Sequence, residues 1–183
     1  AYVYGDGDSE NAVKRTLVER YPRERFYLAN KLPMWLLPEG HTPQELLDTS
    51  LRRTGVTTCL DMAGPLSAVL HYAPETGCAI HAAVLEGFDP KARFGTDKPT
   101  RDELGVFVEE ALAAGAVGVK IMGGHWPLPL ETSSELIRVA NERGAYVAWH
   151  AGSTTAGSNL LGMRETIEAA GTEKLHLAHI NAY

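Results

Sequence analysis

The feature that most constrains the fold is an alternation of short apolar runs with segments of helical periodicity. We expect strands at 26–32, 57–62, 79–86, 117–122, 145–150 and 175–180, with a truncated seventh strand ending at 2–4. Several runs are almost continuously apolar, as parallel strands covered on both faces are. A strand and a helix repeat every 22–38 residues or so, roughly the spacing of βαβ units with right-handed connections and a parallel sheet.

Capping residues indicate where the intervening helices begin and end. Three segments have the capping-box spacing, in which a threonine accepts from a backbone N–H and a glutamate reaches back: Thr42 with Glu45, Thr100 with Glu103, and Thr132 with Glu135. Glycines that fit left-handed C-caps follow five helical runs: Gly55, Gly77, Gly115, Gly144 and Gly171. One helix has a clear apolar face, formed by Leu104, Phe107, Val108, Ala111 and Leu112. We expect 87–99 to be a surface loop.

These patterns predict a single α/β domain over 1–183, built from parallel βα-repeats. A (β/α)8 barrel takes about 250 residues, and at least ~200, whereas this chain has 183. We therefore expect an incomplete or rearranged TIM-barrel-like sheet of six to seven strands. Because open sheet edges are templates for association, we also expect a homo-oligomer joined through those edges.

Charge and composition exclude several partners. Seventeen Lys and Arg against 23 Asp and Glu give a net charge of −6, and without a basic run the chain is not expected to bind nucleic acid. It has no apolar stretch near the ~18 residues that cross a bilayer, so we expect no membrane partner. Cys59 and Cys78 lie in apolar runs, which favours buried thiols and a reducing, cytoplasmic compartment over a disulfide.

Polar residues near the carboxyl ends of the expected strands are the candidate site, because ligands of parallel α/β sheets bind there. Lys120, His150 and His179 are separated by 30 and 29 residues, about one βα unit each. Burial favours the neutral amine of a lysine, which can add carbon dioxide and become an anionic carbamate that binds metal. Imidazoles are ordinary zinc ligands. The alternative is that each residue is a separately satisfied polar group at the edge of the core.

The remaining polar candidates have weaker patterns. Asp61 at the end of its strand could act as a base, or could be a structural carboxylate. The segment 123–129 could line a pocket through His125 and Trp126, or could be a rigid turn braced by prolines. We expect the other histidines to be structural or exposed, or to be uninformative turn residues: His41, His71, His81 and His176.

From about residue 55 onward, the sequence resembles the amidohydrolase superfamily, in the branch of dihydroorotase, hydantoinase and acyl-amino-acid deacylases. The segments that carry the resemblance are GVTTCLDMAGP, VGVKIMGG, YVAWHAGS and LHLAHINAY. It implies a carbamylated Lys120, with His150 and His179 as ligands of one zinc ion whose activated water attacks an amide substrate. The family's His-x-His pair does not occur here, and its final strand, with an Asp that acts as base and ligand, is not expected in this chain.

Residues 1–54 resemble a different family, the aldo-keto reductases. The resemblance is carried by AYVYGDGDSENAVKRTLVERYPRERFYLANKLPMW. It implies that Tyr4 and Lys31 are a catalytic pair, because a nearby ammonium lowers the pKa of a phenol that protonates a carbonyl. The nicotinamide-binding strands of that family have no counterpart here. Tyr4 could equally be an ordinary turn residue.

The change of resemblance falls near 54–58, so we interpret the chain as an aldo-keto-reductase-like segment, 1–54, joined to an amidohydrolase-like segment, 55–183. An engineered or recombined chimera of barrel fragments explains this better than a sequence artefact in a natural gene. Partial catalytic sets lose most of their rate, so we expect no efficient native activity and a vestigial metal site. The alternatives are a one-metal hydrolase of amides or cyclic amides and, with less support, an NADPH-dependent reductase remnant.

Overall fold

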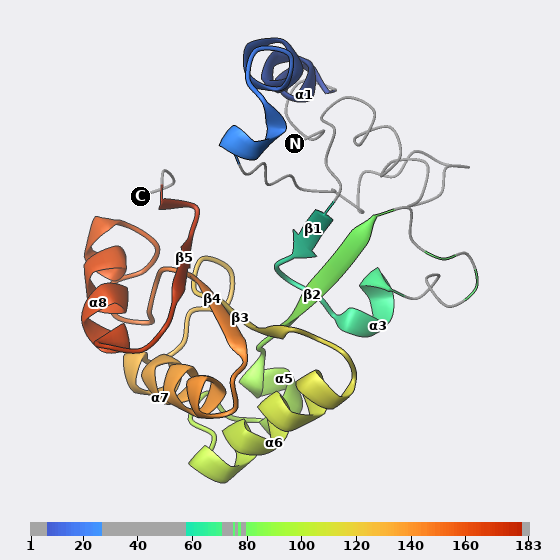
Figure 1. Cartoon of the computed structure of the whole chain (residues 1–183). Coiled ribbons are helices and arrows are strands. Elements are labelled where there is room, and N and C mark those ends of the chain that lie inside the picture. The colour runs from blue at the N-terminus through green and yellow to red at the C-terminus, as the bar shows by residue number, and fades with distance from the viewer. Residues whose placement is uncertain (1–6, 27–57, 71–74, 76, 78–79, 181–183) are drawn as a thin grey trace. The chain divides into compact units, whose positions relative to one another are not determined.

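The computed structural model describes residues 7–26, 58–70, 75, 77 and 80–180. The chain divides into two compact units, one formed by 1–61 with 72–82 and the other by 62–71 with 83–183. In the first unit the described elements are α1 (Asp8–Val13), the π-helical segment η1 (Lys14–Val18), the 3-10 turn η2 (Arg23–Arg25) and β1 (Thr58–Asp61). These elements are labelled or coloured along the chain in Figure 1.

The second unit contains alternating strands and helices, and the strand β2 begins at the boundary between the units. Its elements are α3 (Leu66–Val69), β2 (His81–Gly87), α5 (Pro90–Phe94), α6 (Arg101–Ala113), β3 (Gly118–Met122), α7 (Leu130–Glu142), β4 (Tyr146–His150), α8 (Leu160–Ala170) and β5 (His176–Ala178). The described strands form one sheet in the order β1-β2-β3-β4-β5, and β2 through β5 pair in parallel. An α/β fold with a parallel sheet is thus confirmed.

Five of the expected strands are present with slightly shorter bounds. The strand expected at 2–4, and all but Phe26 of the one expected at 26–32, lie outside the described residues. The junction proposed at 54–58 also falls there, apart from Thr58, the first residue of β1.

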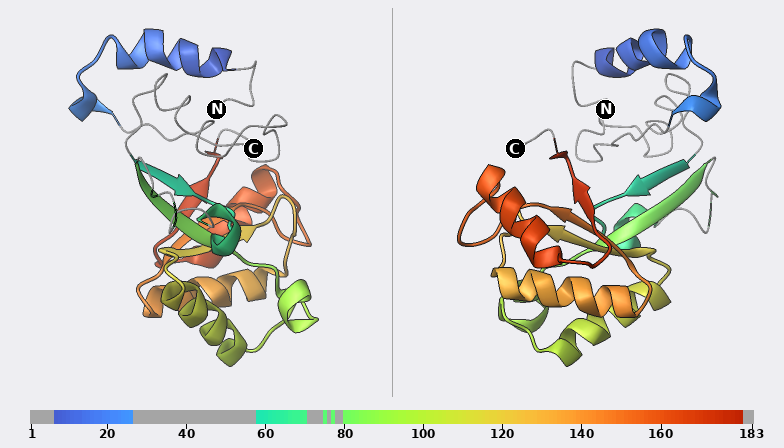
Figure 2. Two further views of the ribbon diagram at one scale, coloured as in Figure 1. Left: turned by 90° about the vertical axis from the view of Figure 1, so that its right-hand side faces the viewer. Right: turned by 60° about the vertical axis from the view of Figure 1, so that its left-hand side comes forward.

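The pairing register gives the central strands two chemically different faces. Lys120 pairs with Ala148 and Met122 with His150, while Val119 and Ile121 pair with Val147 and Trp149. Because side chains alternate along a strand, the second set shares one face and the first set the other. The Val119 face belongs to a core cluster with α6 and α7, and Figure 2 shows these helices running along that side of the strands.

Local sequence explains where most helices start, but two predictions about helix starts and loops were wrong. The capping box of α6 is confirmed, since the Thr100 side chain accepts from Glu103 N and Glu103 from Thr100 N. The box expected at Thr132 is wrong. The helix α7 already begins at Leu130, behind Pro129, so the Thr132 hydroxyl donates instead to the Asp97 carbonyl at 2.8 Å.

The segment 87–99 is not only a loop, because it contains the short helix α5. Asp89 caps this helix by accepting from Ala92 N at 3.0 Å, and Pro90 occupies its first position. Phe88, just before it, is fully buried. The dipeptide Asp-Pro was the available signal for this helix.

Among the described residues, no helix combines the length and the apolar character that crossing a lipid bilayer requires.

Candidate functional site

Two of the predicted site residues, His150 and His179, lie side by side. His150 is the last residue of β4, and His179 directly follows β5. Their ring centres are 5.2 Å apart, with the planes at 66°. Adjacent parallel strands bring their carboxyl ends to the same edge of a sheet, which explains why residues 29 positions apart meet here.

The backbone at His179 differs from the sequence prediction. The strand expected to reach residue 180 ends at Ala178, and His179 has φ 57°, the only positive φ at a described residue other than glycine. This conformation costs an L-residue about 1 kcal/mol or more. Such strained residues concentrate at functional sites, where the surrounding structure holds them in place.

Lys120 is on the same face of the sheet, but deeper than predicted. It lies in the middle of β3, where it pairs with Ala148, two residues before the pair formed by Met122 and His150. The residue is buried, at 2% exposure. Lys120 therefore lies two residues before the level of His150 along the paired strands, rather than at the end of its own strand. The face that carries Lys120 and His150 is called the site face below.

Two residues that the sequence did not indicate fix the position of His150. The Oγ of Ser158, in the loop that follows β4, is 2.8 Å from His150 Nε2. Gly124, in the loop after β3, leaves room for the ring, because a Cβ there would lie 2.3 Å from the same nitrogen. Any larger residue at 124 would therefore displace the imidazole. No sequence signal marked Ser158, whereas Gly124 belongs to a Gly-Gly pair directly after a strand.

A third imidazole, that of His125, lies near this pair. Its ring centre is 6.1 Å from that of His150. The sequence analysis placed His125 in a segment that could line a pocket or form a rigid turn, and did not count it among the candidate ligands.

The ring centres of His150 and His179 have the separation expected of two imidazoles on one ion. Two imidazoles that share a tetrahedral zinc ion, with Zn–N near 2.0–2.1 Å, have ring centres about 5 Å apart, and the observed separation is 5.2 Å. In the part of the chain that the structure describes, no group of three or more His, Cys, Asp or Glu is arranged to hold a metal ion.

A second polar pair occupies the same face nearer the amino ends of the strands. The Tyr146 hydroxyl is 2.6 Å from His176 Nδ1. Partial burial, and then the positive charge of Lys120, lower the pKa of His176 below its ordinary value. The lowered pKa favours the neutral ring, and the direction of its hydrogen bond with Tyr146 depends on the tautomer.

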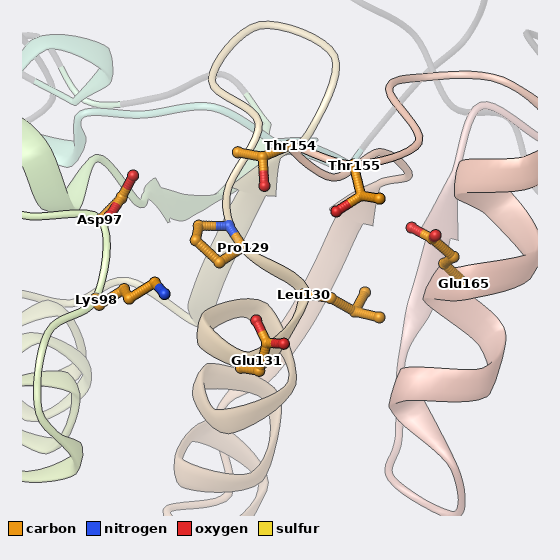
Figure 3. Close-up of a pocket in the computed structure, with 8 residues that line it drawn as sticks. All are labelled: Asp97, Lys98, Pro129, Leu130, Glu131, Thr154, Thr155 and Glu165. Carbon is orange, nitrogen blue, oxygen red and sulfur yellow. The ribbon is translucent and has the colours of Figure 1, made fainter.

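A shallow hollow of the second unit is lined by none of these histidines. It has a volume of about 450 Å³ and is lined by Asp97, Lys98, Pro129, Leu130, Glu131, Thr154, Thr155 and Glu165. Figure 3 shows its side chains arranged around the first turn of α7. None of the residues predicted for the site lines it, and its three carboxylates and one lysine are ordinary surface groups.

The remaining predicted residues lie outside the described residues or in the first unit. Tyr4 and Lys31 lie outside the described residues. Asp61 ends β1 in the first unit, whereas Lys120, His150 and His179 belong to the second. His81, the first residue of β2, is exposed as expected.

The sequence has no match among known protein families or among curated proteins.

Proposed function

We propose that the face formed by β3, β4 and β5 is a one-metal site of the amidohydrolase type, in a chain with no efficient native activity. Its ligands would be His150, His179 and a carbamylated Lys120. The observation that carries the proposal is the pair of imidazoles at the spacing of a shared ion. The buried amine on the same face of the sheet supports it.

The residues supply a route to the third ligand. Burial disfavours the ammonium form of a lysine, and the neutral amine adds carbon dioxide, forming an N–C bond and releasing one proton. The resulting anion restores the charge balance for a cation held by neutral imidazoles. When bound, such an ion would lower the pKa of a water molecule and polarise an amide carbonyl.

The low activity would follow from an incomplete catalytic set. His150, His179 and Lys120 would provide ligands, but the His-x-His pair of the amidohydrolases does not occur in the sequence. Groups that act together lose most of the rate when one is removed. We further propose that the chain is a recombined TIM-barrel-like chimera of six to seven strands, with 1–54 similar to aldo-keto reductases and 55–183 to amidohydrolases. The parallel sheet supports this proposal.

The first experiment measures zinc per chain after purification with zinc and bicarbonate. We expect about one ion per wild-type chain, and none in the His150→Ala/His179→Ala variant. His81→Ala, which removes an exposed imidazole outside the site, is the matched control and should retain the ion. Zinc retained by the double variant, or absent from the wild type, would contradict the proposal.

Two further variants test a proposed ligand, Lys120, and a residue that positions another ligand, Gly124. Lys120→Ala should lose both the zinc and the carbamate signal that ¹³C-bicarbonate gives in an NMR spectrum. Gly124→Ala changes no ligand residue, yet it should weaken zinc binding because its Cβ displaces the His150 ring. An unchanged zinc affinity in Gly124→Ala would show that His150 is not a ligand in the position found here.

The activity is tested separately, on dihydropyrimidines, hydantoins and acyl-amino acids. We expect hydrolysis by the zinc-loaded protein no faster than by Lys120→Ala. Clear turnover above that control would establish the alternative, an active one-metal hydrolase. No observation in the described residues favours the reductase alternative.

A further inference from the structure

Ser158 and His150 form a hydroxyl–imidazole pair beside the carboxyl end of β4. The Oγ of Ser158 is 2.8 Å from Nε2 of His150, within the range over which a base takes a proton from a nucleophile. When the ring carries its own proton on Nδ1, Nε2 accepts the hydroxyl proton of Ser158. Ser158 is exposed, so its oxygen is accessible to a molecule from solution. The pair therefore combines a nucleophile, a base and access.

The loop that carries Ser158 is held on both sides of this residue. The Asn159 side chain donates to the Ala156 carbonyl at 2.6 Å and accepts from Gly162 N at 3.1 Å. The first turn of α8 also packs closely against the loop, because a Cβ at Gly162 would lie 2.0 Å from the Gly157 carbonyl oxygen. A nucleophile on a fixed segment loses little freedom when it is placed for attack.

The imidazole of His150 is held by parts of the chain other than this loop. A Cβ at Gly124 would lie 2.3 Å from Nε2 and 2.7 Å from Cδ2, so the ring rests directly against the loop after β3. The His179 ring meets it edge-on, with the ring centres 5.2 Å apart. Ser158 and His150 are thus positioned independently and meet at hydrogen-bond distance, which is the arrangement of an activated nucleophile.

We propose that Ser158 of the metal-free chain is a nucleophile that His150 activates, and that its substrates are activated carboxylic esters such as aryl acetates. The Ser158 oxygen forms a bond to the ester carbonyl carbon while its proton passes to His150 Nε2. The bond to the aryl oxygen then breaks, and the imidazolium returns the proton to the departing aryl oxide. Water next attacks the acyl-serine and gives a proton to Nε2, which passes it to the serine oxygen. One ester and one water yield a phenol and a carboxylic acid.

This activity goes beyond the proposed metal site, although both use the His150 ring. A ring nitrogen bound to zinc has no lone pair for the serine proton, so zinc on Nε2 and an activated Ser158 exclude each other. The serine activity is therefore measured on metal-free protein, where its outcome does not depend on whether zinc binds. Failure of one proposal leaves the test of the other intact.

The experiment follows the release of 4-nitrophenol from 4-nitrophenyl acetate by the EDTA-treated chain. Peptide mass spectrometry after an acid quench locates the acetylated residues. We expect acetyl-Ser158 in the wild type, formed about tenfold or more slowly in His150→Ala, since a positioned base contributes at least that much. Ser158→Ala should slow 4-nitrophenol release by a similar factor, although it keeps all seven histidines.

Two further variants provide the controls. His81→Ala removes an exposed imidazole outside the pair and should hydrolyse the ester as fast as the wild type. Residues that act as a unit are not additive, so Ser158→Ala/His150→Ala should be no slower than either single variant. Circular dichroism would verify that each variant keeps the fold.

Three results would overturn the proposal. One is a wild type in which Ser158 carries no acetyl group, and another is a Ser158→Ala variant that releases 4-nitrophenol as fast as the wild type. The third is acetylation of Ser158 at the wild-type rate in His150→Ala, which would show that the hydroxyl reacts without the imidazole.

Discussion

The two faces of β3 and β4 differ in chemistry, although alternating residues of the same strands form them. Val119, Ile121, Val147 and Trp149 are at most 3% exposed and pack into the helix-covered core. The opposite face has Lys120, His150, Tyr146 and, from β5, His176, side chains that titrate or donate hydrogen bonds. One strand can thus supply stability and chemistry at once, because its side-chain period is two.

The largest difference in stability between the faces should appear when two adjacent residues of β4 are replaced. Trp149→Ala removes a fully buried indole and should lower the free energy of unfolding by about 3–5 kcal/mol. His150→Ala removes a half-buried ring from the other face and should cost about 1 kcal/mol or less, through its hydrogen bond to Ser158. Urea denaturation of both variants measures the difference, and equal losses would mean that the two faces do not divide their roles.

Lys120 is the buried polar residue of the face opposite the helices, and its replacement gives the next largest effect. Lys120→Met keeps the length of a side chain that is 2% exposed but removes its polar amine. Because Lys120 interacts with other groups of the fold, the variant leaves those groups unsatisfied and should lower the free energy of unfolding by about 1–3 kcal/mol. The same variant should lose zinc. An unchanged or raised stability would show instead that Lys120 serves the site and not the fold.

Periodicity predicted the helix-covered face better than it predicted the site face. An alternation of apolar runs and capped helices was enough for the parallel sheet and for the buried stripe of α6. The pairing of His150 with His179 followed from their spacing by one βα unit. The depth of Lys120, the left-handed turn at His179 and the bond from Ser158 depend on register and loop geometry, which no local pattern encodes.

The stability of the helix-covered face should also depend on Thr100, which caps α6. Thr100→Ala removes the cap of α6 and should lower the free energy of unfolding by about 1 kcal/mol. Hydrogen bonds from the Thr100 backbone and side chain lower the pKa of Glu103, so that contribution is present above the ordinary pKa of a glutamate and is lost on acidification.

The difference between wild type and Thr100→Ala should therefore shrink as the pH falls through the lowered pKa of Glu103. Urea denaturation over a pH series measures it, with Thr172→Ala, in the turn after α8, as the control. A difference that stays constant with pH would show that the reciprocal bond of Glu103 adds nothing to the cap.

The smallest effect reports on the charge of Lys120 itself. Burial and the Lys120 ammonium lower the pKa of His176, so Lys120→Met should raise that pKa towards its ordinary value, as an NMR titration of the imidazole would measure. Lys91→Met removes an exposed ammonium of α5 and is the control. Carbamylation would make the charge negative and raise the pKa of His176 above that in Lys120→Met.

Because the unfolded chain binds the His176 proton more readily, the wild type loses stability as the pH falls through the ordinary histidine pKa. An unchanged pKa in Lys120→Met would separate His176 from the amine and leave the two ends of this face electrostatically independent.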